Sequence, residues 1–345
     1  MILGIESTAH TFGVAVVDDG KVLSNIRNMY TTEKGGIIPV DSAKHHREVC
    51  EKVYEDALVK AGINEKQLIA VAFSQGPGLA PCLLAGLHFT KKIAVKLEIP
   101  VIPVNHCIAH LEIGAITGAS DPVLLYCSGA NTQIIAYASY SDPHSNTTNK
   151  FAECKSSGKY RVFGETLDLG VGNFIDTFAR YAGLGFPGGP KIAELAEKSK
   201  NYIELPYSIK GMDLAFSGIL TKLDQMFKSG KYKLEDLSFS LQETVFAMLV
   251  EAAERALAHT GKKELLLGGG VACNKRLQEM ARIMCEERGC KFFVPENQFL
   301  VDNAGMIAFT GEILFKKGIF VSVNNVKDID ILPRERTDDV LVKWK

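Results

Sequence analysis

The order of predicted strands and helices occurs twice along the chain, and this repetition constrains the fold more than any other feature of the sequence. Residues 1–29 open with strands joined by short turns, and helices then alternate with short apolar strands. From residue 122 the same order begins again, with strands around a polar turn followed by strand–helix units. Such alternation is typical of mixed sheets covered by helices. The sequence therefore predicts two duplicated α/β lobes with a cleft between them.

Apolar spacing and turn residues predict the individual elements. Residues 139–159 are polar and rich in Ser, Asn and Thr, so we expect an exposed loop there. The predicted strands are residues 2–5, 12–18, 21–29, 68–74, 101–104, 122–126, 133–138, 160–163, 263–267 and 292–294. The predicted helices are residues 41–61, 82–97, 174–182, 191–198, 237–260, 274–288 and 305–317.

Composition and charge exclude several classes of protein. Hydrophobic residues make up 46% of the chain and charged residues 23%, values that exclude extensive disorder. The 39 Lys and Arg residues nearly balance the 40 Asp and Glu residues, so the formal net charge is −1. A broad basic face for nucleic acid is therefore not expected, and any RNA contact needs a local patch or the charge of a partner.

Neither a membrane segment nor a disulfide framework is predicted. The chain lacks a run of about 18 or more apolar residues, so we expect no transmembrane helix and no contact with a membrane. Residues 1–17 have no basic leader and are predicted to form strands rather than a signal peptide. The eight cysteines form no C-x-x-C pair. Reduced thiols and a cytoplasmic location fit this pattern better than disulfides do.

His106 and His110 stand four residues apart, shortly after a predicted strand. On a helix, side chains at this spacing share one face, and two imidazoles can converge on one metal ion. A polar helix face without a metal is the alternative. Residues 107 and 108 are Cys and Ile, so the H-E-x-x-H motif of zinc proteases is absent and further ligands must come from elsewhere. Asp302, before the last helix, is a candidate ligand, and its alternative role is a helix N-cap.

Three glycine-containing turns follow or join predicted strands, at residues 4–8, 128–132 and 268–274. Glycines let backbone amides approach a phosphate, and the third turn precedes a helix N-terminus, which favours anions. None of the turns matches the P-loop or the Rossmann glycine motif. Asp168 and Asp176 lie near further glycine-rich segments and would either cap helices or accept hydrogen bonds from a ribose. The turns indicate either a nucleotide cleft or ordinary chain reversals.

These residues together resemble the family of KEOPS catalytic subunits, the archaeal and eukaryotic branch of the tRNA threonylcarbamoyltransferases whose bacterial members are called TsaD. The resemblance runs from Gly4 to Trp344, and the closing RTDDVLVKW is similar to the archaeal and eukaryotic ending. The other matching segments are GIESTAH, SQGPGLAP, VNHCIAH, YCSGANTQIIAY, FGETLDLGVGN, FPGGP, LPYSIKGMDLAFSG, SLQETVFAML, GGGVACN and VDNAGMIA.

The resemblance implies the ASKHA fold, the two-lobed architecture of actin, sugar kinases and Hsp70. The first lobe would span residues 1–120, completed by about 303–345, and the second residues 121–302, with a loop insertion at 139–159. The resemblance also implies a reaction, the transfer of a threonylcarbamoyl group from threonylcarbamoyl-AMP to a tRNA. The acceptor would be the exocyclic amine of the adenosine 3′ of the anticodon, in tRNAs that read codons beginning with A, and AMP would leave.

A set of site residues follows from the same resemblance. One divalent metal ion, Fe2+ in preference to Zn2+, would be held by His106, His110 and Asp302, with Tyr126 as a phenolate ligand or a close neighbour. Further candidates at the site are Glu6, Ser7 and Ala193. The adenylate, or an ATP- or AMP-type nucleotide, would contact Tyr126, Cys127, Ser128, Gly129, Ala130, Asp176, Gly189 and Asn274.

Two positions depart from the family pattern. Ala130 replaces the second glycine of SGGNTQ, where a Cβ atom could crowd the phosphates, and Ala193 stands where archaeal members often have an acidic residue. The implied partners are tRNA, a small kinase-like ATPase subunit, a small dimerising subunit and a third small subunit. The implied location is the cytoplasm or, in a eukaryote, the nucleus. A metabolite kinase of the same fold is the main alternative function, and a metalloprotease and a non-catalytic scaffold are two more.

Overall fold

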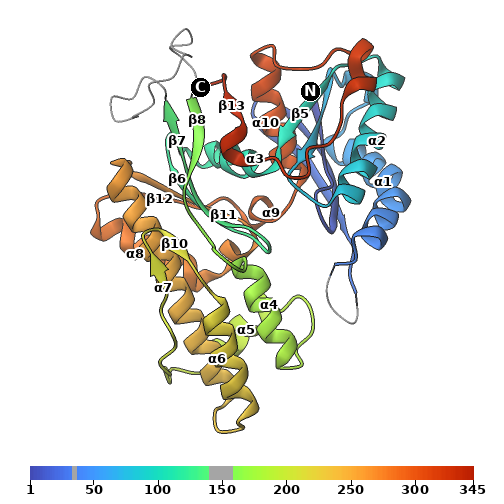
Figure 1. The fold of residues 1–345 in the computed structure, drawn as a ribbon. Coiled ribbons are helices and arrows are strands. Elements are labelled where there is room, and N and C mark those ends of the chain that lie inside the picture. Colours follow the sequence, from blue (N-terminus) through green and yellow to red (C-terminus); the bar gives the residue numbers. More distant parts are fainter. Residues whose placement is uncertain (33–36, 140–157) are drawn as a thin grey trace.

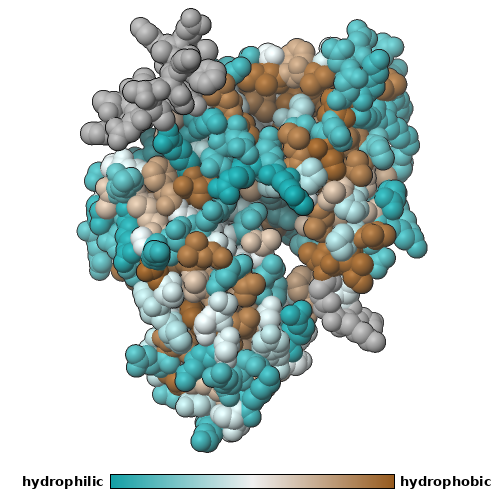
Figure 2. Space-filling view, viewed as in Figure 1, coloured by the Kyte–Doolittle hydropathy of each residue, from teal (hydrophilic) through white to brown (hydrophobic). Residues whose placement is uncertain are grey.

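The computed structural model describes residues 1–32, 37–139 and 158–345. Most of the loop predicted at residues 139–159 lies outside the described residues. The described chain forms two large sheets, each with helices packed against it (Figure 1). No helix in these three segments is long and apolar enough to cross a membrane. The face drawn in Figure 2 is a mosaic of hydrophilic and hydrophobic residues.

The first sheet has five strands in the order β3-β2-β1-β4-β5. β1 pairs antiparallel with β2 and parallel with β4, so a hairpin continues into a parallel half. Both faces of β1 are buried: Leu3 and Ile5 cluster with α1 and α2, whereas Ile2 clusters with α10. Gly4 allows this contact, because a Cβ atom there would lie 2.5 Å from Ala308 N in α10. The elements are β1 (Ile2–Glu6), β2 (Thr11–Asp18), β3 (Lys21–Met29), α1 (Pro39–Ala61), η1 (Glu65–Gln67), β4 (Ala70–Gly76), α2 (Ala80–Leu97), β5 (Val101–Asn105), α10 (Ala304–Lys316) and η4 (Val323–Asp328).

The second sheet has six strands in the order β12-β11-β6-β7-β8-β13. β6 pairs antiparallel with β7 and parallel with β11, so β8-β7-β6-β11-β12 repeats the arrangement of the first sheet. The predicted duplication is confirmed. The elements are β6 (Val123–Cys127), β7 (Thr132–Ser139), β8 (Gly158–Glu165), α4 (Val171–Tyr181), α5 (Gly189–Ala196), β9 (Ile209–Lys210), β10 (Asp213–Leu214), α6 (Ser217–Lys228), α7 (Leu234–Thr260), β11 (Glu264–Gly268), η3 (Gly270–Cys273), α8 (Lys275–Glu287) and β12 (Lys291–Phe293).

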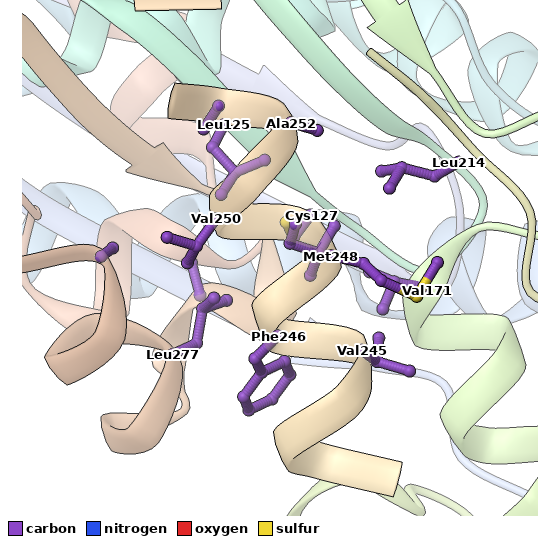
Figure 3. Packing of buried hydrophobic residues seen from close by; sticks show 14 of the residues in the cluster. Leu125, Cys127, Val171, Leu214, Val245, Phe246, Met248, Val250, Ala252 and Leu277 are labelled. Atoms are coloured by element: carbon purple, nitrogen blue, oxygen red, sulfur yellow. The ribbon is translucent and has the colours of Figure 1, made fainter. Parts of the chain in front are cut away.

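The long helix α7 packs the outer face of the second sheet. Val245, Met248 and other apolar residues of α7 meet Leu125 and Cys127 of β6 in one buried cluster (Figure 3). Burial of such side chains stabilises the lobe by roughly 1.5–3 kcal/mol for each large residue. This core leaves the opposite face of the sheet free to contact the first lobe.

The region between the two sheets is filled by α3 (His106–Glu112) and α10 (Figure 1). Ile108 of α3, Met306 of α10 and Leu124 of β6 belong to one buried cluster. α3 continues into η2 (Ile113–Thr117), and the C-terminal tail passes through η5 (Thr337–Asp339) into β13 (Leu341–Val342), which pairs with β8. The tail therefore joins the second sheet, whereas α10 packs on the first. The exact limits of the lobes stay a prediction.

Several elements escaped prediction from the sequence. They are α6, the β9–β10 hairpin, the short helix α9 (Asn297–Leu300) and β13. α6 has no local capping side chain; instead the carboxylate of Asp168 accepts the backbone N–H groups of Phe216 and Ser217, each at 2.9 Å. Asp168 thus has the capping role that the sequence left open.

Candidate metal and nucleotide site

The helix α3 begins where β5 ends. Asn105 is the N-cap, and its side-chain oxygen accepts the backbone N–H of Ile108 at 3.1 Å. The helix therefore starts at His106, and the four-residue spacing brings His106 and His110 onto one face, with ring centroids 4.8 Å apart. Both histidines are buried between the lobes.

Asp302 lies between α9 and α10 and faces both histidines. Its Oδ1 is 3.3 Å from Nε2 of His106 and 3.5 Å from Nε2 of His110. The N-cap of α10 is the next residue, Asn303, whose side-chain oxygen accepts the N–H of Met306 at 3.0 Å. Because Asn303 caps the helix, the Asp302 carboxylate is available to a ligand. One ligand atom from each of the three residues lies within 4.8 Å of the others.

The charges at this cluster are strongly coupled. Burial alone would lower the pKa of His106, but the carboxylates of Glu6 and Asp302 raise it well above its usual value. Burial would raise the pKa of Asp302, but His106 and His110 hold it well below the usual range. Burial lowers the pKa of His110. The ionised carboxylate of Asp302 therefore lies beside the neutral imidazole of His110, and these two groups are suitable ligands for a cation.

The nitrogens of His110 provide a direct test of whether a metal fits. Both are buried and lack a hydrogen bond in the part of the chain that the structure describes, and the nearest group to Nε2 is Oδ1 of Asp302 at 3.5 Å. Buried polar atoms without partners are rare, and each needs a partner that the protein alone does not supply. A divalent cation on Nε2 would be such a partner. Two imidazole nitrogens and a carboxylate oxygen suit Fe2+ or Zn2+.

Tyr126 is the last residue but one of β6 and is buried in the same place. Its hydroxyl lies 3.4 Å from Nε2 of His106, and its ring centroid is 4.9 Å from that of His110. Burial raises the pKa of this phenol well above its usual value. Without a cation the side chain is therefore a neutral phenol beside the ligand cluster.

Glu6 and Ser7, at the end of β1, differ in their relation to the cluster. Oε2 of Glu6 is 3.0 Å from Nδ1 of His106, and Oε1 accepts the N–H of Thr8 at 2.7 Å. The Ser7 side chain instead lies against α2, because a Cβ atom on Gly86 would be only 2.0 Å from its Oγ. Glu6 is thus part of the cluster, and Ser7 packs beside it.

The turn after β6 contains Ser128, Gly129 and Ala130. The Ser128 hydroxyl is bonded to the carbonyl of Asn131 at 2.9 Å, whereas Gly129 and Ala130 are exposed. The carbonyls of Ser128 and Gly129 accept N–H groups from the start of α4, at 3.1 and 2.9 Å. Ala130 is not among the described residues with a positive φ. Its backbone therefore accommodates an L-residue without strain in place of the family's glycine.

The turn after β11 touches the turn after β6. Gly269 has φ +88°, and a Cβ atom there would lie 2.4 Å from the carbonyl carbon of Cys127. Asn274 follows as the N-cap of α8: its oxygen accepts the N–H of Arg276 at 2.8 Å, and its amide nitrogen donates to Gln242 at 2.9 Å. The two glycine turns of the second lobe are thus in close backbone contact.

Asp176 and Gly189 lie on α4 and α5 of the same lobe. Oδ1 of Asp176 accepts the N–H of Gly188 at 2.7 Å, and burial raises the pKa of this carboxyl. A Cβ atom on Gly189 would meet nothing within 4 Å, so space is open above it. Ala193 is half-buried one turn further along α5.

His10 is a residue that the sequence did not single out. Its ring, in the turn between β1 and β2, lies 6.4 Å from the ring of Phe186, just before α5. A positive charge on His10 would partly offset the rise in the pKa of Asp176 that burial causes. The first lobe therefore reaches the α4–α5 corner of the second, a contact that no local pattern signals.

Solved structures define the class to which this architecture belongs. HypF from T. kodakarensis matches 92% of this chain and 48% of its own, with a TM-score of 0.58 and 15% identity. An activator of 2-hydroxyisocaproyl-CoA dehydratase from Clostridium difficile, solved with ADPNP, matches 95% of this chain and 96% of its own, with a TM-score of 0.50 and 11% identity. These are ASKHA-type proteins, and the predicted fold class is confirmed.

Sequence comparison narrows the class to one family. The chain matches the TsaD family, described as tRNA N6-adenosine threonylcarbamoyltransferase, over residues 21–153 and 145–309. The protein of that name from Thermococcus sibiricus is 50% identical over 342 residues, 99% of each chain. The one from Thermofilum pendens is 46% identical over 346 residues, covering 100% of this chain and 97% of the relative. A probable bifunctional tRNA threonylcarbamoyladenosine biosynthesis protein from Methanosarcina mazei is 50% identical over 347 residues, 99% of this chain and 59% of that longer protein. The chain belongs to the TsaD family.

Proposed function

We propose that this chain is a tRNA N6-adenosine threonylcarbamoyltransferase. The threonylcarbamoyl group would pass from threonylcarbamoyl-AMP to the exocyclic amine of the adenosine 3′ of the anticodon, in tRNAs that read codons beginning with A. A C–N bond forms, the C–O bond between the carbamoyl carbon and the phosphate breaks with its electron pair leaving on AMP, and the amine releases a proton to solvent. The observation that carries the proposal is the convergence of His106, His110 and Asp302 beside the glycine turns. Relatives of nearly full coverage that bear this activity in their names support it.

The metal in this proposal is one divalent ion per chain, Fe2+ or alternatively Zn2+. His106, His110 and Asp302 would hold the ion, with Tyr126 as a close neighbour. When bound, the ion supplies Lewis acidity that draws electron density from a phosphate or carbonyl oxygen. Burial of both histidines excludes water from their side of the site, which strengthens each electrostatic contact there.

Residues of the second lobe would hold the adenylate. Asp176 accepts the backbone N–H of Gly188 on Oδ1, and a carboxylate has further acceptor capacity for a ribose hydroxyl. Asn274 uses one of its two amide hydrogens for Gln242, so the second is available to the nucleotide. The exposed turn at Gly129 and Ala130 offers backbone to the phosphate, and Gly189 leaves open space for the ribose. Cys127 and Ser128 complete this turn. Because an adenosine amine is a weak nucleophile, positioning of both reactants is the main contribution of these residues.

The partners proposed with this function are tRNA and three small subunits of a KEOPS-like complex: a kinase-like ATPase, a dimerising subunit and a third subunit. The near balance of charges supports the proposal that this chain and the partner subunits bind tRNA together, since a net charge of −1 gives the chain alone little attraction for a polyanion. The proposed location is the cytoplasm.

A metabolite kinase is the alternative function, because the C. difficile activator of the same fold was solved with an ATP analogue. The two functions differ in their products. Purified chain and partners are incubated with tRNA, radiolabelled threonine, bicarbonate, ATP and the enzyme that makes the adenylate. Labelled threonine in tRNA, with AMP formed in equal amount, supports the transferase. Unlabelled tRNA, together with phosphate transfer to small metabolites, would contradict the transferase proposal and support the kinase.

A further inference from the structure

Glu6 is a buried carboxylate in contact with one of the candidate metal ligands. Its side chain is 0% exposed, and its Oε2 lies 3.0 Å from Nδ1 of His106. The other ring nitrogen of His106, Nε2, faces Oδ1 of Asp302 at 3.3 Å. The two ends of the imidazole therefore have different neighbours, Glu6 on one side and the ligand cluster on the other.

We infer that Glu6 is a positioning residue that sets the orientation and the tautomer of His106. A carboxylate oxygen that faces a ring nitrogen can accept its N–H, so Oε2 of Glu6 favours a proton on Nδ1 of His106 when a cation takes the place of the proton on Nε2. The lone pair of Nε2 then points toward His110 and Asp302. A carboxylate that holds the outer N–H of a metal-binding histidine fixes the ring and increases the basicity of the ligand nitrogen. This inference rests on the metal site of the proposed function.

Thr8 holds Glu6 itself in place. The backbone N–H of Thr8 donates to Oε1 of Glu6 at 2.7 Å, and the Thr8 hydroxyl donates to the same oxygen. One carboxylate oxygen is thus committed to the turn after β1, and the second is left for His106. β1 is the central strand of the first sheet. Glu6 therefore ties the orientation of His106 to the centre of that sheet.

His110 provides the contrast within the same site. Its Nδ1 is buried and has no hydrogen-bond partner among the described residues. Of the two histidines, only His106 has a carboxylate on its outer nitrogen. The loss of Glu6 should therefore act through His106.

Glu6→Gln tests this role with almost no change in side-chain volume. If the glutamine oxygen accepts both Thr8 donors, its NH2 group faces Nδ1 of His106 and favours the wrong tautomer. Metal binding is measured with Co2+ as the probe, by competition with a coloured chelator and by the visible spectrum of the bound ion. We expect Glu6→Gln to bind Co2+ about 10–100-fold more weakly than the wild type. Glu335→Gln is the matched control, because Glu335 bonds to Asn105 at the start of α3 at 2.8 Å and contacts neither histidine; its affinity should change less than about threefold.

The outcomes separate this inference from the proposed function. Co2+ affinity unchanged in Glu6→Gln but lost in His106→Ala with His110→Ala would overturn the role of Glu6 and leave the metal site intact. No stoichiometric binding by the wild type would overturn both. If Glu6→Gln does not fold, the zinc-loaded wild type is measured by nitrogen-15 NMR of its histidines. Zinc on Nε2 of His106 with the proton on Nδ1 supports the inference, and zinc on Nδ1 overturns it.

Discussion

One buried carboxylate, Glu112, connects three distant parts of the chain, and removal of one of its partners should measurably destabilise the fold. Glu112 is the last residue of α3. Its Oε1 accepts a hydrogen bond from the Tyr160 hydroxyl of β8 at 2.6 Å and from the Trp344 indole of the tail at 2.7 Å. All three residues are at most 8% exposed. The contact therefore joins the helix that carries His106 and His110 to the second sheet and to the C-terminus.

Tyr160→Phe deletes only the hydroxyl. A hydrogen bond to a charged group contributes about 1.5–3 kcal/mol, and we expect the free energy of unfolding to fall by that amount. Trp344→Phe removes the second donor and should cost at least as much. The double variant leaves Glu112 without a side-chain donor among the described residues, so its cost should exceed the sum of the single costs by about 1 kcal/mol.

Urea unfolding, followed by circular dichroism, measures these values. The matched control is Tyr181→Phe, because Tyr181 is 47% exposed on α4 and should tolerate the loss of its hydroxyl. A change below about 0.5 kcal/mol in Tyr160→Phe, equal to that of the control, would show that the hydrogen bond to Glu112 does not stabilise the fold. It would mean that the carboxylate is not held at this junction in solution.

Three further predictions concern acid stability, the nucleotide and tRNA. Burial lowers the pKa of His46 to about 4 in the folded chain. The unfolded chain therefore takes up this proton at a higher pH than the folded chain does. The free energy of unfolding should fall by up to roughly 3 kcal/mol as the pH drops from about 6.5 to 4. His46→Gln should flatten this part of the pH–stability curve, and an unaltered slope would contradict the assignment. Asn274→Ala should cost about 1 kcal/mol of stability as a lost N-cap and weaken nucleotide binding by roughly 1–3 kcal/mol; unchanged nucleotide affinity in calorimetry would count against Asn274 as a contact. The chain alone should bind tRNA weakly, and added partner subunits should raise the affinity. They should also steepen the log–log dependence of affinity on salt, by roughly 0.7–0.9 for each phosphate that they neutralise. Equal affinity and equal slope in filter binding with and without partners would show that this chain alone makes the RNA site.

The duplicated order of elements was predictable because hairpins and strand–helix units leave local patterns. The elements that escaped prediction depend on distant residues. α6 is capped by Asp168, which lies 49 residues before Ser217, and β13 is two residues long and is ordered by its pairing with β8. Neither feature has a signal within its own segment.

In the candidate site, too, local patterns predict some features and contacts between distant residues determine the others. The spacing of His106 and His110 predicts that they share a helix face, and the structure has them there. The approach of Asp302 depends on Asn303 taking the cap, a choice between neighbours that both favour that position. The contact between Glu6 and His106 spans 100 residues and arises only from the tertiary fold, which brings the end of β1 close to the start of α3. Sequence patterns give the ligand types, and tertiary packing decides which of them meet.

The proposed function requires a bound metal ion for the transfer reaction, so a metal titration of that reaction is its sharpest test. Chelator-treated chain, with the proposed partner subunits, is supplied with threonylcarbamoyl-AMP and tRNA while Fe2+ or Zn2+ is added in steps. We expect modified adenosine to appear in proportion to bound metal and to reach its full extent at one ion per chain. It should be absent at every metal concentration when His106 and His110 are both alanine. Full transfer by the metal-free chain, or by the double alanine variant, would contradict the proposed function.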